Sequence, residues 1–325
     1  MSQSTIPDYL HQLSIPTPFP VGPVNVYLAE GERLTLVDTG PRYEPARETL
    51  QEQLNELGYQ TAHLQRIVLT HAHADHCGLA AELVAESGAE VWTHEENVEQ
   101  LAGEGDAQRM AFYARLLRWS GVPLLVMVKL ARVQRGLHQY AEPLTPDHLV
   151  TDGDALDLDG DVWQVLHTPG HTGGLICLHH PERRLLISSD HLLRDISSNA
   201  MVDPPSPGSA QRPRRLVEYL AQLRRVAQLD LRLTLPGHGP AITDHRALIQ
   251  ERLAFHEERA DRIREALEDR MLSAYQLARI LFPELDAVNT FLAVSEVIGH
   301  LQWLEARGQV NHAERGGVAR WTRVD

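Results

Sequence analysis

The stretch His71-Ala72-His73-Ala74-Asp75-His76 (HAHADH) holds four potential metal ligands within six residues. It directly follows the short apolar segment Arg66–Leu69, which predicts a buried strand, and it leads into Leu79–Ser87, which has helical spacing. On a turn, side chains two residues apart can converge on one cavity. Imidazole and carboxylate groups are donors that suit a divalent transition metal. The stretch therefore predicts a metal site at the end of a strand.

Three further potential ligands stand where later strands are expected to end. They are His171 in Thr168-Pro169-Gly170-His171-Thr172, Asp190 in Ser188-Ser189-Asp190, and His238 in Pro236-Gly237-His238-Gly239. Each signal alone is weak, because a lone histidine after a strand is more often an ordinary surface or core residue. Strand ends, however, bring residues to one rim of a sheet, where sites on α/β scaffolds gather. We therefore expect these three residues to join the HAHADH stretch in one site.

In this order, HAHADH, TPGHT, the strand-end Asp190 and PGHG resemble the motifs of the metallo-β-lactamase superfamily. Asp38 in Leu36-Val37-Asp38-Thr39-Gly40 matches another of its motifs. The resemblance covers about residues 20–245. It implies an α/β fold of the four-layer αββα sandwich type, in which two mixed sheets face each other with helices outside.

The resemblance also implies how two divalent metal ions would be held. His71, His73 and His171 would bind one ion, whereas Asp75, His76 and His238 would bind the second. Asp190 would bridge both ions, with a hydroxide between them. Zinc is the expected metal, and iron or manganese would suit the same ligands.

Three carboxylates have separate expected roles. Asp190 would be catalytic as the bridging ligand, and Asp75, or a metal-bound water, would handle the proton. Asp38 would orient a ligand from the outer shell of the site, as carboxylates often do. A simple turn cap at the end of a strand is the alternative for Asp38.

The rest of the chain suggests three parts. We expect a catalytic domain over residues 1–245 with a helical insertion at about 95–145, a linking helix at 246–270, and a small domain at 271–325. The insertion would either pack as a helical excursion or form an apolar lid. In the small domain, two helical segments precede a hairpin signature at Arg315-Gly316-Gly317. This part resembles the winged-helix extension of the β-lactamase-like protein 2 group, whose animal members are single-strand endoribonucleases.

Composition narrows the partners. The chain has 30 basic and 44 acidic residues, a formal charge of −14, so it is a poor non-specific binder of polyanions. Its two cysteines argue against a disulfide framework. No signal peptide is recognised, and the most apolar run, Val122–Val128, is far shorter than the roughly 20 residues that span a bilayer. We expect a cytoplasmic protein without membrane contact. Its partner is expected to be a small molecule, with RNA as the alternative, and it could also form a homodimer.

Three functions are compatible with the motifs. True β-lactamases of this fold commonly have Cys at the position of Asp190, and the Asp form resembles the thioesterase, phosphodiesterase and nuclease branches. A dinuclear hydrolase of a thioester or related acyl compound is the first hypothesis. The second is a single-strand endoribonuclease, which would need a basic groove built from scattered arginines such as Arg194, Arg212, Arg214 and Arg215. The third is a persulfide dioxygenase with one iron, held by two His and one Asp.

Overall fold

The computed structural model describes residues 6–205, 211–286 and 289–324. Its first sheet contains six strands in sequence order. They are β1 (Leu10–Ile15), β2 (Val24–Ala29), β3 (Thr35–Val37), β4 (Arg66–Val68), β5 (Glu90–His94) and β6 (His148–Val150). The pairs from β1 to β3 are antiparallel and those from β3 to β6 are parallel, so the sheet is mixed.

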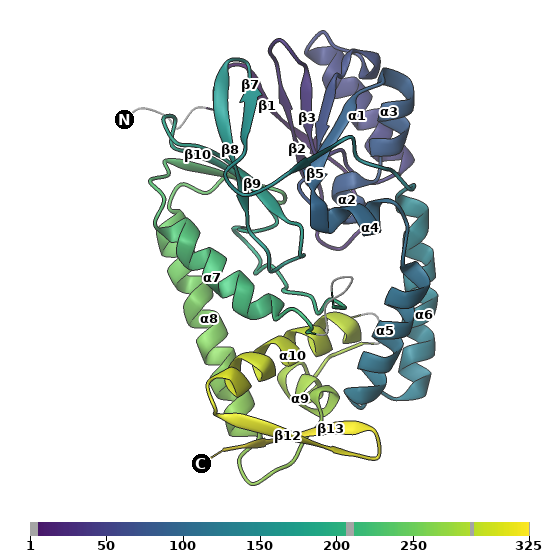
Figure 1. Ribbon diagram of the computed structural model, residues 1–325, viewed down its shortest axis with the longest axis vertical. Coiled ribbons are helices and arrows are strands. Elements are labelled where there is room, and N and C mark those ends of the chain that lie inside the picture. The colour runs from purple at the N-terminus through teal and green to yellow at the C-terminus, as the bar shows by residue number, and fades with distance from the viewer. Residues whose placement is uncertain (1–5, 206–210, 287–288, 325) are drawn as a thin grey trace.

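The second sheet contains five strands in the order β11-β10-β9-β8-β7. They are β7 (Ala155–Leu158), β8 (Asp161–His167), β9 (Ile176–His180), β10 (Leu185–Ser189) and β11 (Leu233–Pro236). Only the β10–β11 pair is parallel among these described strands. The two sheets occupy the upper half of Figure 1.

The burial of alternate side chains shows how the layers are stacked. In β2, Val26 and Leu28 pack with Leu50 of α1 (Glu44–Glu56) on the outer side of the first sheet, together with α3 (Ala80–Ser87). The neighbouring Tyr27 instead packs between the two sheets, in the same cluster as Trp163 of β8. A third cluster joins the outer face of the second sheet to α7 (Arg215–Ala227) and α8 (His245–Ala266). The layers are therefore helix, sheet, sheet and helix, which confirms the predicted sandwich.

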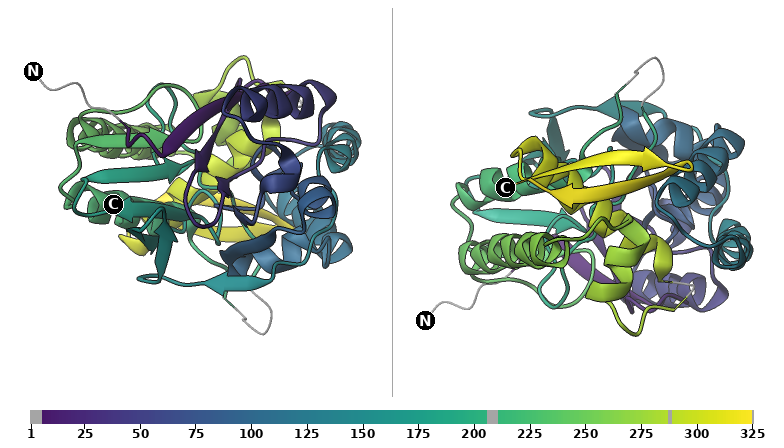
Figure 2. Two further views of the ribbon diagram at one scale, coloured as in Figure 1. Left: turned by 90° about the horizontal axis from the view of Figure 1, so that it is seen from above. Right: turned by 90° about the horizontal axis from the view of Figure 1, so that it is seen from below.

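The C-terminal part contains α9 (Ala274–Leu281), α10 (Thr290–Ala306) and the hairpin β12 (Val310–Arg315) and β13 (Val318–Arg323). Ser273 begins α9 through a capping box, in which its hydroxyl accepts from Gln276 N and the Gln276 side chain accepts from Ser273 N. Figure 2 shows the hairpin lying across the C-terminal helices when the molecule is seen from below. The two helices and hairpin agree with the sequence, and the winged-helix resemblance stays a prediction.

The helical insertion packs into the C-terminal core. It forms α5 (Asp106–Trp119) and α6 (Leu124–Leu137), preceded by the short α4 (Val98–Leu101). Tyr113, Leu116 and Leu117 of α5 lie in one apolar cluster with residues of α8, α9 and α10. Trp119 of α5 also donates from Nε1 to Glu314 of β12, at 2.8 Å. The described apolar face of α5 is thus covered by the C-terminal elements, as expected for a packed helical excursion.

This shared core predicts that the helical insertion and the C-terminal elements unfold together. Trp321 of β13 is only 1% exposed and lies in the same cluster as Tyr113. We expect Trp321→Ala to lower the free energy of unfolding by about 3–5 kcal/mol, because a large buried ring leaves a cavity. Urea unfolding measures the loss, and hydrogen exchange should show faster exchange in α5 as well as in the hairpin. Arg323→Ala on the same strand is the control, and unchanged protection of α5 would contradict the shared core.

No helix among the described residues is both long and apolar enough to cross a bilayer.

Candidate metal centre

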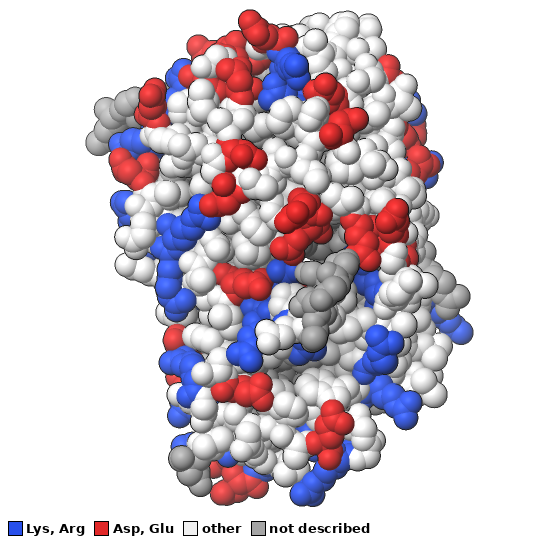
Figure 3. Space-filling view, in the orientation of Figure 1, with Lys and Arg blue, Asp and Glu red and all other residues white. Residues whose placement is uncertain are grey.

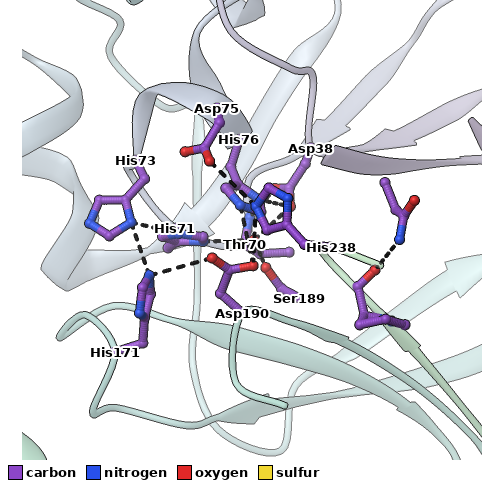
Figure 4. Close-up of polar contacts among 12 residues, drawn as sticks. Asp38, Thr70, His71, His73, Asp75, His76, His171, Ser189, Asp190 and His238 are labelled. Carbon is purple, nitrogen blue, oxygen red and sulfur yellow. Dashed lines mark hydrogen bonds and ion pairs between the residues drawn. The ribbon is translucent and has the colours of Figure 1, made fainter. Parts of the chain in front are cut away.

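All seven predicted ligands lie together at one end of the sandwich (Figure 4). His71 and His73 follow β4, and Asp75 and His76 belong to the short helix α2 (Ala74–Cys77). The other three stand just after β8, β10 and β11. They are His171, Asp190 and His238. Strands from both sheets therefore deliver side chains to one rim, as the sequence predicts.

Three histidines form the first group. His73 Nδ1 lies 3.1 Å from His71 Nε2 and 3.0 Å from His171 Nε2. Two ligands of a tetrahedral ion, each at about 2.0–2.1 Å, stand about 3.3 Å apart. The three nitrogens are therefore spaced much as the ligands of one ion would be.

Asp75, His76 and His238 form the second group. His238 Nε2 lies 3.4 Å from Asp75 Oδ2, and His76 Nε2 lies 3.4 Å from Asp190 Oδ1. Asp190 stands between the groups: its Oδ1 faces His76 and, at 3.7 Å, His238, while its Oδ2 lies 3.6 Å from His171 Nε2. The two oxygens of one buried carboxylate therefore face different histidine groups.

In three of these histidines, Nδ1, the nitrogen that faces away from the other ligands, contacts a hydrogen-bond acceptor. His171 Nδ1 contacts Asn199 O at 3.0 Å, and His238 Nδ1 contacts Pro23 O at 2.8 Å. His76 Nδ1 lies 2.8 Å from Asp38 Oδ2. Carbonyl and carboxylate oxygens accept hydrogen bonds, so each Nδ1 carries the proton in the neutral ring and each Nε2 is left with a free lone pair.

Two of those nitrogens and one oxygen of Asp190 make no hydrogen bond within the described protein, whereas His171 Nε2 lies 3.0 Å from His73 Nδ1. His76 Nε2, His238 Nε2 and Asp190 Oδ1 are buried and make no hydrogen bond. Buried polar atoms without partners are costly, so a group of them that converges on one place indicates a ligand. Imidazole nitrogens and a carboxylate oxygen are donors to a divalent cation, and these residues fit such ions.

The charges at the site also suit cations. Burial lowers the pKa of His71 and, together with His73, lowers the pKa of His171 to about 4, so both rings are neutral at neutral pH. For Asp190, burial opposes ionisation, but the facing His76 outweighs it and holds the pKa of Asp190 well below its usual range. Burial likewise opposes a charged His76, yet Asp190 and Asp38 raise the pKa of His76 well above normal. The buried carboxylates thus favour a positive charge in the second group, which a bound metal ion would supply in place of the His76 proton.

Asp38 is fixed behind the second group by its neighbours. It directly follows β3 and has a φ of 61°, a left-handed conformation that Asp tolerates better than most residues. Its carboxylate accepts from Thr70 N and Thr70 Oγ1, each at 2.8 Å, and faces His76. Thr70 Oγ1 lies 2.7 Å from Ser189 Oγ, which links β4 to β10. Thr70 and Ser189 were not predicted as site residues, although each is adjacent to a predicted ligand.

This arrangement predicts the effect of neutralising Asp38. Asn also tolerates a positive φ, so Asp38→Asn should fold, but its amide cannot replace the charged acceptor for His76. We expect metal affinity to fall by about 10–100-fold, as for other outer-shell partners. Titration against a chelating dye measures this, with Asp157→Asn at an exposed position as the control. Unchanged affinity would reduce Asp38 to a turn cap.

A separate cluster of His94, Glu96 and His167 also has ligand-like spacing, but its members have partners of their own. The two rings stack with centroids 3.8 Å apart. His167 Nε2 contacts Gly173 O at 2.7 Å, and Glu96 pairs with the buried Arg215 at 2.9 Å. The cluster therefore supports the loop that carries His171.

Comparisons with known proteins agree with this geometry. The family model described as the metallo-beta-lactamase superfamily matches residues 19–238, and the model described as the metallo-beta-lactamase-like C-terminal domain matches residues 260–324. A crystal structure of a metallo-beta-lactamase family protein from Thermus thermophilus is similar at a TM-score of 0.84 and 30% identity. It covers 97% of this chain, which covers 99% of that protein.

Similar proteins span much of the chain, and three of the following four are named as hydrolases or thioesterases. The probable metallo-hydrolase YqjP of Bacillus subtilis is 36% identical over 94% of this chain and 95% of its own length. The beta-lactamase-like protein 2 homolog of Caenorhabditis elegans is 23% identical over 92% of this chain and 79% of its own. The human acyl-coenzyme A thioesterase MBLAC2 is 25% identical over 66% of this chain and 72% of its own length. The Haemophilus influenzae hydroxyacylglutathione hydrolase GloC is 26% identical over 60% of this chain and 77% of its own length. The chain belongs to the metallo-β-lactamase superfamily and is a metal-dependent hydrolase.

Proposed function

We propose that the chain hydrolyses a thioester or a related small acyl substrate with two divalent metal ions, zinc being the expected metal. The observation that carries the dinuclear part is the position of Asp190. Its Oδ2 faces His171 of the first group, and its Oδ1 faces His76 and His238 of the second group. A carboxylate shared in this way suits a ligand that bridges two ions.

The residues divide the work of the site. His71, His73 and His171 would hold one ion, Asp75, His76 and His238 the other, and Asp190 both. Such a pair of ions supplies an activated water and withdraws charge from a carbonyl oxygen. The side chain of Asp75 is 15% exposed, more than that of Asp190. Burial raises the pKa of Asp75, but the neighbouring His76 and His238 outweigh this and lower it. Its carboxylate is therefore anionic at neutral pH and can accept the proton.

The charge distribution favours a small acyl substrate over a nucleic acid. Arg215 is buried and paired with Glu96, Asp203 and Glu218, and Arg194 is paired with Asp195. Two of the four arginines considered for a basic groove are therefore already neutralised. Over the described residues of the face in Figure 3, basic side chains stand in separate groups among acidic ones. Human MBLAC2 and GloC, named for thioester substrates, support the same substrate class.

A substrate panel tests the proposal. The full chain, loaded with zinc, is assayed on acyl-coenzyme A thioesters of several lengths, on a hydroxyacylglutathione and on single-stranded RNA. We expect thioester cleavage, measured by thiol release, and its loss in Asp190→Asn. RNA cleavage that disappears in Asp190→Asn, without thioester cleavage, would replace the proposal with the endoribonuclease. Oxygen consumption on a persulfide by an iron-containing chain would replace it with the dioxygenase.

A further inference from the structure

A small pocket with a mixed polar and apolar lining adjoins the chain segment that supports His171. It has a volume of about 180 Å³ and is formed by the segment that follows Asp190 and by α7, α8 and α10. This is several times the volume of one water, about 30 Å³, and less than the pocket of a drug-sized ligand. Its lining includes Ser198, Asn199, Leu216, Phe255, His256 and Glu296.

The pocket and the metal centre share one chain segment. That segment leaves the centre at Asp190, and Asn199 then returns to it, because Asn199 O contacts His171 Nδ1 at 3.0 Å. Asn199 is also one of the residues that line the pocket. A molecule in the pocket would therefore contact the residue that orients one of the predicted metal ligands.

Hydrogen bonds fix the tautomers of two buried histidines at this pocket. His300 Nδ1 contacts Glu296 O at 2.8 Å, and a carbonyl can only accept, so His300 Nδ1 carries the proton. Burial lowers the pKa of His300 to about 4 and of His256 to about 3, so both rings are neutral. The bare His300 Nε2 must then accept from His256 Nδ1, 3.2 Å away. His256 Nε2 is consequently an acceptor.

That acceptor is buried and unused. His256 is 3% exposed, and its Nε2 has no hydrogen-bond partner among the described residues. Asn199 Oδ1 also lacks one, while its amide nitrogen donates to Leu292 O at 3.4 Å. Ser198 Oγ is a third buried polar atom without a partner. The residues that line the pocket thus carry two unused acceptors and a hydroxyl, together with the apolar Leu216 and Phe255.

The charges around the pocket exclude an anion. Glu296 lines it, and Arg259 is already paired with that carboxylate at 2.8 Å. Arg259 also lies over the Phe255 ring, 4.8 Å from its centroid. An anionic ligand would meet a carboxylate and the lone pair of His256 Nε2, with no free cation among the described lining residues to bind it.

We propose that this pocket binds a small neutral group that donates hydrogen bonds, a hydroxyl or an amide N–H, to His256 Nε2 and Asn199 Oδ1. The group is either part of the substrate or a separate small ligand, since both present the same chemistry. Binding needs no hydrolysis, so it can be tested whether or not the proposed thioester activity is found.

The test uses lactamide as a neutral donor, lactate as its anionic counterpart and N,N-dimethylacetamide as a probe without donors. Nitrogen-15 spectra of the histidine-labelled full chain report the His256 ring. We expect a saturable shift of an unprotonated Nε2 with lactamide, with a Kd of about 1 mM for a ligand of this size. The other two probes should bind at least ~10-fold more weakly, because the acceptors stay unpaired.

Variants separate the pocket from the rest of the fold. His256→Phe keeps a ring but removes the acceptor, and we expect it to weaken lactamide binding at least ~10-fold. Glu258→Gln, an exposed position on the same helix, should leave binding unchanged. Competition between lactamide and substrate would assign the group to the substrate, and binding without competition would assign it to a separate ligand. The proposal is overturned if lactamide causes no saturable shift, or if all three probes bind equally. It is also overturned if His256 Nε2 is protonated in the free chain. That last measurement uses the wild-type chain, so it does not depend on whether His256→Phe folds.

Discussion

Asp190→Asn is expected to lower kcat/KM by at least ~1000-fold, which corresponds to about 4 kcal/mol. The substitution preserves the shape of the side chain but removes the negative charge that faces His171, His76 and His238. Without that charge, the two metal ions lose a shared anionic ligand. Their mutual electrostatic repulsion is then no longer offset by the carboxylate. Steady-state thiol release and the metal content of the purified variant both measure the loss.

A neighbouring acid provides the control for Asp190. Asp195 lies on the same segment, is exposed and pairs with Arg194 at 2.9 Å. Asp195→Asn should therefore keep both metal content and activity. If Asp190→Asn retains two ions and more than about a tenth of the wild-type rate, the bridging role of Asp190 is wrong.

Gly237→Ala is the second substitution with a large expected effect. A Cβ on residue 237 would lie 2.5 Å from Asp190 Oδ1 and 2.9 Å from His76 Cε1. Both neighbours are packed and buried, so the new methyl group must displace a predicted ligand of the second ion. We expect activity to fall by about 100-fold or more, since small displacements of reacting groups have effects of this size. Metal titration should show selective loss of the second ion, which His76 is predicted to hold.

Gly136→Ala is the matched control for that substitution. It places the same methyl group on a glycine of α6 with no heavy atom within 4 Å. It should leave activity unchanged and can stabilise the helix slightly. Full activity in Gly237→Ala would show that the segment after β11 can move away from the metal centre.

Local sequence features predicted that the seven side chains of the candidate metal centre converge. HAHADH places four donors on one turn, and the TPGHT and PGHG turns each follow a strand whose direction is set by its apolar residues. Because strand ends share a rim, their convergence could be predicted without knowing the strand order. The predicted strand Arg66–Leu69 corresponds to β4, which ends one residue earlier, at Val68.

Other features depend on contacts that the sequence does not encode locally. β1 was not predicted because Leu10, Leu13 and Ile15 are spaced by three and then two residues, which breaks the alternation of a strand. The packing of α5 against the C-terminal helices joins residues about 200 positions apart, such as Trp119 and Glu314. Asn199 holds His171 through its backbone carbonyl, which any residue type could supply. Arg215, considered for a basic groove, is instead buried among three acids.

Elemental analysis of the full chain, purified without added metal, tests the dinuclear centre most directly. The positions of the two ligand groups and of Asp190 predict about two zinc or manganese ions per chain. They also predict a clear loss of metal in Asp190→Asn. A single iron per chain, unchanged in that variant, would contradict the account and make the dioxygenase the leading interpretation.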